Sequence, residues 1–184
     1  KAFTGSLPGL TKLSADAAAA LATFAGKKSG GGKLNLFGLA TLSPEAARGL
    51  AAFQGELELD GLAEIDADTA AALAQYAGRE LSLKGLKTLS VETAAELAKA
   101  KAWDGELRSL RSLSDEAAAA LAGFEGKGLL ITGGLLSDRA LQALAGFRGA
   151  SLYLIVPRPR LSDEAVRALA GFKGDNLSLA GLRE

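Results

Sequence analysis

The side chains that carry most enzyme chemistry are absent from this sequence. It contains no His and no Cys, which removes the usual general base, the thiolate nucleophile, disulfides and the commonest metal ligands. A Ser-Lys pair or two carboxylates could still support hydrolysis. Most of the carboxylates outside the expected strands, however, lie at expected helix starts, where they have a structural use. We therefore predict that the chain is not an enzyme and holds no cofactor or metal ion.

One Gly-rich segment, residues 26–33, contains the residue types of a phosphate-binding loop. The spacing does not fit, because Lys27 stands where that motif requires its first Gly and Leu34 stands where it requires a hydroxyl residue. The segment also precedes an expected strand, whereas the motif precedes a helix. We interpret it as a flexible insertion between repeats.

A unit of about two dozen residues is repeated along the chain and must position every other candidate side chain. Within each unit the apolar residues change from alternation to helical spacing, which predicts a short strand followed by a helix. An imperfect first copy runs from Gly5. The first Leu of the seven later units falls at Leu34, Leu57, Leu81, Leu107, Leu129, Leu152 and Leu177.

The helix boundaries are marked by residue type. Each expected helix is preceded by a side chain that can accept a hydrogen bond from the first turn: Ser14, Ser43, Asp66, Ser90, Ser114, Ser137 and Ser162. Two residues later six units have an acid that offsets the helix dipole, and Arg139 is the exception. A Gly closes each unit, and we expect it in the left-handed conformation that stops a helix: Gly26, Gly55, Gly78, Gly105, Gly126, Gly149 and Gly174.

An aromatic residue lies just before each closing Gly: Phe24, Phe53, Tyr76, Trp103, Phe124, Phe147 and Phe172. Six of them follow a helix Leu by three residues, so we expect each pair on one helical face. Trp103 is displaced by Lys99–Lys101, three residues that nearly complete a turn and would preserve that face. We predict a packed ladder of rings, in preference to a row of ligand-binding aromatics.

The pattern L-x-L-x-G-L-x-x-L-S-D-E-A-x-x-A-L-A, clearest from Leu161 to Ala170, resembles the leucine-rich repeat superfamily, and most closely its cysteine-containing, helix-bearing subclass. The sequence departs from that subclass where it has Cys or Asn, since Leu39, Leu62, Leu86 and Leu182 stand there. The resemblance implies an α/β fold: a right-handed solenoid of about seven repeats, with short parallel strands on the concave face and helices on the convex face. It also implies a protein-binding scaffold.

The strand positions beside the inward Leu residues are the candidate contacts for a protein partner. Phe37, Tyr153 and Ile155 are large apolar side chains that would face solvent on the concave face. Charged candidates on the same face are Glu58, Asp60, Lys84 and Arg108. A merely solvated face with scattered apolar groups remains the alternative.

The repeat breaks most sharply at residues 152–160, where two Pro residues stiffen the chain. Arg158 and Arg160 flank Pro159 and could grip an acidic partner from a contact loop. The alternative is a tolerated insertion without a binding role.

Composition limits the partner classes. The 21 basic and 21 acidic residues cancel, so nothing favours nucleic acid, and no apolar run is long enough to insert into a membrane. No Met begins the chain and no polar cap is evident at either end, so we expect residues 1–184 to be one solenoid domain of a longer array. The leading function is therefore a non-catalytic scaffold that presents its concave sheet to a protein. The alternative is a structural element that self-associates end to end through open terminal repeats.

Overall fold

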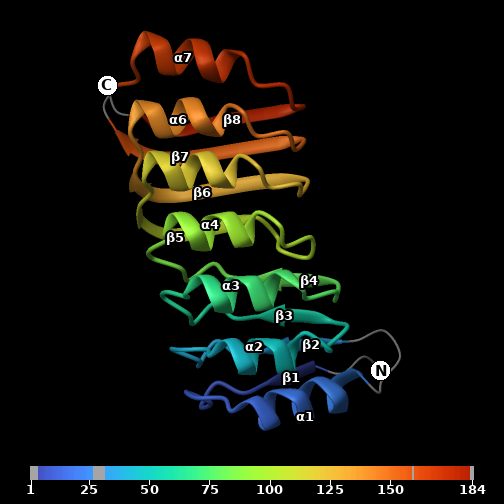
Figure 1. The fold of residues 1–184 in the computed structure, drawn as a ribbon. Coiled ribbons are helices and arrows are strands. Elements are labelled where there is room, and N and C mark those ends of the chain that lie inside the picture. Colours follow the sequence, from blue (N-terminus) through green and yellow to red (C-terminus); the bar gives the residue numbers. More distant parts are fainter. Residues whose placement is uncertain (1–3, 27–31, 159, 183–184) are drawn as a thin grey trace.

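Strand and helix units stack along one axis, with the strands on one side of the stack and the helices on the other (Figure 1). The computed structural model describes residues 4–26, 32–158 and 160–182. This arrangement confirms the predicted α/β repeat solenoid. The Gly-rich segment lies mostly outside the described residues, and its interpretation as an insertion stays a prediction.

The strands and helices alternate throughout the described residues. The strands are β1 (Thr4–Ser6), β2 (Lys33–Asn35), β3 (Glu56–Glu58), β4 (Glu80–Ser82), β5 (Glu106–Ser112), β6 (Gly128–Leu135), β7 (Ser151–Arg158) and β8 (Asn176–Leu182). The helices are α1 (Ala15–Gly26), α2 (Pro44–Leu50), α3 (Ala67–Ala74), α4 (Val91–Leu97), α5 (Asp115–Leu121), α6 (Asp138–Leu144) and α7 (Asp163–Ala170).

The strands form two parallel sheets instead of one continuous sheet. The first sheet has the order β1-β2-β3-β4 and the second β5-β6-β7-β8. The predicted Leu register holds within each sheet, since Leu34 pairs with Leu57 and Leu57 with Leu81. Leu129 likewise pairs with Leu152. The register predicted for Leu107 is wrong, because Leu107 lies opposite Ile131 and not opposite Leu129.

A glycine in the turn after each short strand lets the turns of the first sheet stack closely. A Cβ added at Gly61 would lie 1.9 Å from the carbonyl oxygen of Phe37, and one at Gly85 would lie 1.9 Å from that of Asp60. The turns of successive repeats thus stack so closely that only Gly fits. In the next repeat Ser109 occupies the position of Gly85, and β5 continues as a strand to Ser112. Strands of seven or eight residues, not the predicted short ones, therefore form the second sheet.

The helix starts agree with the sequence prediction, whereas the helix ends do not. All seven predicted caps accept a hydrogen bond from the backbone N–H three residues later, as Ser43 does from Ala46 at 3.2 Å. Among the described closing glycines only Gly105 has a positive φ, of 74°. The closing glycine is needed for a steric reason, because a Cβ at Gly126 would lie 2.1 Å from Cζ of Phe124. It leaves room for the ring two residues earlier.

The aromatic ladder is confirmed from Trp103 onward. Ring centroids are 4.8 Å apart between Trp103 and Phe124, 6.3 Å between Phe124 and Phe147, and 6.5 Å between Phe147 and Phe172. The rings lie just beyond the helix ends and not on the helices. The side chain of Phe24 is outside the described part of the chain.

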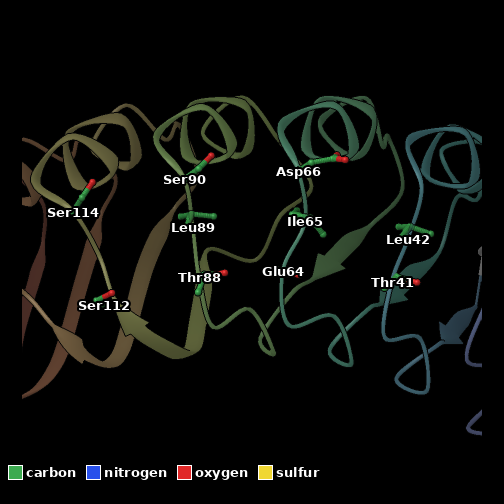
Figure 2. Close-up of a pocket in the computed structure, with 10 residues that line it drawn as sticks. All are labelled: Thr41, Leu42, Glu64, Ile65, Asp66, Thr88, Leu89, Ser90, Ser112 and Ser114. Carbon is green, nitrogen blue, oxygen red and sulfur yellow. The ribbon is translucent and has the colours of Figure 1, made fainter.

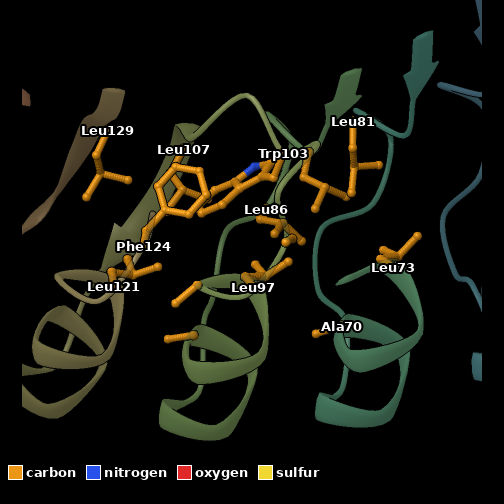
Figure 3. Packing of buried hydrophobic residues seen from close by; sticks show 14 of the residues in the cluster. Ala70, Leu73, Leu81, Leu86, Leu97, Trp103, Leu107, Leu121, Phe124 and Leu129 are labelled. Carbon is orange, nitrogen blue, oxygen red and sulfur yellow. The ribbon is translucent and has the colours of Figure 1, made fainter. Parts of the chain in front are cut away.

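Trp103 reaches the ladder by a route that the sequence analysis predicted wrongly. Helix α4 ends at Leu97, so Lys99–Lys101 add no helical turn. The Ala100 N–H donates to the Leu97 carbonyl at 2.9 Å, as the Phe124 N–H does to Leu121, so Ala100 takes the aromatic's backbone position. Trp103 lies three residues later beside Leu81, and its ring packs against Phe124 between the strand and helix leucines (Figure 3). An aromatic from an isolated bridge before β5 thus fills the space that other repeats fill from a helix end.

Candidate functional site

The strand face is the part of the fold where side chains are not all needed to pack the core of the repeat. Alternate strand positions point into the core, as Leu57 and Leu81 do, and the positions between them point away from the helices. The predicted contact residues all belong to this face or to its edge. The charged candidates Glu58, Asp60, Lys84 and Arg108 lie on or between β3 and β5, and two of the three apolar candidates lie on β7.

Glu58 and Asp60, on and just after β3, are bound by side chains of neighbouring repeats. The Glu58 carboxylate lies 2.5 Å from the Lys33 Nζ and accepts a hydrogen bond from the Asn35 amide. The Asp60 carboxylate accepts hydrogen bonds from the Ser82 hydroxyl at 2.7 Å and from the Lys84 backbone N–H at 3.0 Å. Both carboxylates therefore tie one repeat to the next.

Lys84 joins the two sheets across the break between β4 and β5. Its Nζ lies 3.2 Å from Asp104 and 3.3 Å from Glu106, and the Arg108 Nε lies 2.8 Å from the same Glu106 oxygen. Burial raises the pKa of Asp104, against the opposing effects of the Glu106 N–H and the Lys84 ammonium. The Arg108 hydrogen bond lowers the pKa of Glu106, with burial opposing it. Glu58, Lys84 and Arg108 thus each pair with an opposite charge, and Asp60 is held by neutral hydrogen-bond donors.

The apolar candidates face solvent as the sequence predicts. The exposed fractions are 48% for Phe37, 39% for Tyr153 and 41% for Ile155. Phe37 follows β2 in the first half, whereas Tyr153 and Ile155 lie on β7 in the second. The structure therefore does not bring Phe37 together with the other two.

An apolar patch forms around the two β7 side chains. Tyr153 pairs with Leu130 of β6, which is half-buried, and Ile155 pairs with Thr132. We call Leu130, Tyr153 and Ile155 the apolar patch. Leu130 was not predicted, although its place in the unbroken apolar run Leu129–Ile131 is a signal that both faces of β6 are apolar.

Residues 152–158 form a strand and not the predicted contact loop. Strand β7 extends through Arg158 and pairs with β8 to that residue, with a register shift after Ile155. Pro157 lies in that irregular stretch, where a missing N–H is tolerated. The Arg158 side chain lies outside the described part of the structure, and Arg160 is exposed just beyond the strand.

A groove that the sequence analysis missed runs along the edge where strands turn toward helices (Figure 2). Its volume is about 660 Å³ and it crosses four repeats, with lining residues Thr41, Leu42, Glu64, Ile65, Asp66, Thr88, Leu89, Ser90, Ser112 and Ser114. Several of its polar groups already have partners: Asp66 caps α3 through the Thr69 N–H at 2.7 Å, and the Thr93 hydroxyl donates to the Ile65 carbonyl at 3.3 Å. The recurring hydroxyl two residues before a cap, at Thr41, Thr88 and Ser112, is the signal that could have predicted it.

Two further properties of the described residues bear on chemistry. They contain no group of three or more His, Cys, Asp or Glu side chains arranged to hold a metal ion. None of the helices in the described ranges combines the length and apolarity needed to cross a membrane.

Comparison with known proteins identifies the fold and no closer relationship. No protein-family model matches the sequence, and no curated protein matches it. Among solved structures, the chain is similar to an internalin from Listeria monocytogenes, with a TM-score of 0.50 and 15% sequence identity. The similarity covers 90% of this chain and 58% of that one. It supports the leucine-rich repeat type of fold and says nothing of a shared partner.

Proposed function

We propose that this chain is a non-catalytic protein-binding scaffold whose contact surface is centred on the apolar patch. The observation that carries the proposal is the exposure of Tyr153 and Ile155 on an interior strand. Because β7 pairs with β6 and β8, its backbone is already used, and only its side chains can contact a partner. These side chains point away from the core that their neighbours Leu152 and Leu154 fill. A binding role explains an exposed aromatic and an exposed β-branched residue at such a position.

The charges of the chain favour a protein partner over nucleic acid. Lys33, Lys84 and Arg108 each pair with an acid, so the strand face has no continuous basic stripe within the described residues. The internalin likeness is consistent with a scaffold, by analogy of fold alone.

Membership of the cysteine-containing subclass is part of the proposal, with Leu39, Leu62 and Leu86 fully buried at the positions of its Cys or Asn. So is the placement of residues 1–184 as one domain of a longer array.

Photo-crosslinking tests the surface directly. A photoreactive phenylalanine analogue replaces Tyr153 in one variant and Val166, which is 49% exposed on α7, in a control variant. After irradiation in cell extract, we expect a discrete protein adduct from position 153 and none from position 166. The adduct should disappear when Ile155→Ser is added. Equal adducts from both positions, or none from position 153, would refute the proposal.

A self-assembling structural element is the second candidate function. Leu177 continues the row of Leu129 and Leu152 but is 37% exposed, whereas those two are fully buried. A further layer, from the same chain or another copy, would cover it. Light scattering across a concentration series distinguishes the two functions: growth in mass that Leu177→Lys abolishes supports assembly, and a constant monomer mass contradicts it.

A further inference from the structure

The two halves of the strand face differ in charge. Strands β6, β7 and β8 contain no acidic residue, whereas the strands of the first sheet contain Glu56, Glu58 and Glu80. Lys33 pairs with Glu58, and Arg79 lies 3.0 Å from Glu56. The first half is therefore a mixed and internally paired surface, and the second half is apolar with no negative charge of its own on β6 to β8.

Two basic side chains lie beyond the apolar patch, toward the carboxyl ends of β5 and β7. Arg111 lies near the end of β5, and Arg160 follows β7. Both are exposed, and within the described residues neither has an acid within ion-pair distance. Glu106 is the acid that shares the strand row of Leu130 and Tyr153, and it is already held by Lys84 and Arg108. A carboxylate of a partner could pair with the guanidinium groups of Arg111 and Arg160, which have no acid of their own among the described residues. An ammonium group of a partner would find Glu106, which already pairs with two basic side chains.

We infer that the apolar patch receives a protein segment in which a large apolar side chain is flanked by carboxylates. This inference rests on the proposed function and specifies the partner. The apolar side chain covers Tyr153 and Ile155, and the carboxylates pair with Arg111 and Arg160. Guanidinium groups suit this role because they bind carboxylates with two parallel hydrogen bonds and lose little hydration. The apolar contact supplies most of the affinity, and the charge pairs select the segment and its orientation.

Two synthetic peptides with a fluorescent label test the inference with the whole chain. One has Trp and Leu at its centre with Glu on both sides, and the other differs only in having Lys for every Glu. We expect fluorescence anisotropy to give at least about tenfold tighter binding of the acidic peptide at low salt, and the preference should shrink as salt rises. Equal binding, preference for the basic peptide, or no binding of either would overturn the inference.

Matched variants locate the contacts. Arg111→Glu and Arg160→Glu should each weaken the acidic peptide by about tenfold and reduce its salt dependence. Arg139→Glu, an exposed charge reversal on α6, should leave binding unchanged. Tyr153→Ala should abolish binding, whereas Phe37→Ala should not. An equal effect of the α6 reversal, or a loss through Phe37→Ala alone, would contradict the inference.

The outcomes separate the inference from the proposed function. If position 153 crosslinks a protein partner while the basic peptide binds better, the scaffold function holds and the acidic partner is wrong. If position 153 crosslinks nothing and neither peptide binds, both are wrong.

Discussion

Trp103 lies beside Leu81 in an isolated parallel bridge that joins the two sheets. The Leu81 N–H donates to the Ala102 carbonyl at 2.7 Å, and the Asp104 N–H donates to the Leu81 carbonyl at 3.0 Å. Beyond this bridge, the Arg111 N–H donates to the Lys87 carbonyl at 3.0 Å, and side chains add Lys84 bound to Asp104 and Glu106 and the Trp103 ring packed on Phe124. The two sheets thus meet at one isolated bridge, where the regular ladder of backbone pairs is interrupted.

The stacked turns of the first sheet predict a strict requirement for glycine. Gly61→Ala and Gly85→Ala each place a Cβ 1.9 Å from a backbone carbonyl oxygen, which cannot move without displacing the neighbouring repeat. We expect each to lower the free energy of unfolding by about 3 kcal/mol or more, measured by urea denaturation with circular dichroism. Gly9→Ala is the control, since nothing lies within 4 Å of its added Cβ. Similar losses for all three variants would contradict the stacked-turn interpretation.

Loss of the hydroxyl should lower the free energy of unfolding at one tyrosine and leave it nearly unchanged at the other. Tyr76 is buried, and its hydroxyl donates to the Gly55 carbonyl at 2.6 Å. Tyr76→Phe leaves that carbonyl without this partner and should cost about 1–2 kcal/mol of unfolding free energy. Tyr153→Phe, on the exposed patch, should change it by less than about 0.5 kcal/mol. Thermal or urea unfolding of both variants measures the two costs. Equal costs would show that the hydrogen bond of the Tyr76 hydroxyl does not stabilise the fold.

The aromatic ladder predicts coupling between a ring and the glycine two residues later. The three atoms nearest to a Cβ at Gly126 all belong to the Phe124 ring, and Cζ is 2.1 Å away. Gly126→Ala should therefore be strongly destabilising in the natural chain and much less so beside Phe124→Leu, which removes the distal ring atoms. A double-mutant cycle by urea denaturation measures this, with an expected coupling of about 1–3 kcal/mol. Additive effects would mean that the glycine has a backbone role independent of the ring.

The sequence predicts those features that depend on one residue and its local hydrogen bond. The seven helix caps are an example, because a Ser or Asp side chain reaches the N–H three residues later in any repeat of this kind. The outward direction of Phe37, Tyr153 and Ile155 follows from alternation along a strand. The fold class follows from the repeat of these local patterns.

Features that depend on contacts between repeats could not be predicted in the same way. Strand β5 continues through Ser109, at the position of Gly85, and the need for Gly in that turn arises only because the turn stacks on a carbonyl of the preceding repeat. The place of Trp103 depends on an insertion whose length suggests a helical turn, although its residues lie beyond the end of α4. The ion pair between Lys84 and Asp104 depends on which residues lie opposite each other across the break, and the shifted register of Leu107 was not evident from the sequence.

The junction finally predicts an unusual dependence of stability on pH. Burial raises the pKa of Asp104 above its ordinary value of 3.8 in the folded chain. Between the unfolded and folded pKa values the folded state binds more protons than the unfolded state, so the free energy of unfolding falls as pH rises through that window. Glu106 has the opposite sign, because Arg108 lowers its pKa and its contribution is lost as pH falls.

Two matched substitutions separate these effects. Asp104→Asn cannot ionise, yet its Oδ1 can still accept the Glu106 N–H, which lies 3.0 Å away in the natural chain. Urea denaturation between about pH 4 and pH 7 should show this variant gaining stability relative to the natural chain as pH rises. Glu106→Gln should lose relative stability as pH rises toward 4.5, the ordinary pKa of the Glu carboxyl, and should change little at higher pH. If Asp104→Asn also loses relative stability with rising pH, the ion pair with Lys84 outweighs the burial of Asp104, and the two sheets are held together by a net favourable charge pair instead of by packing around Trp103.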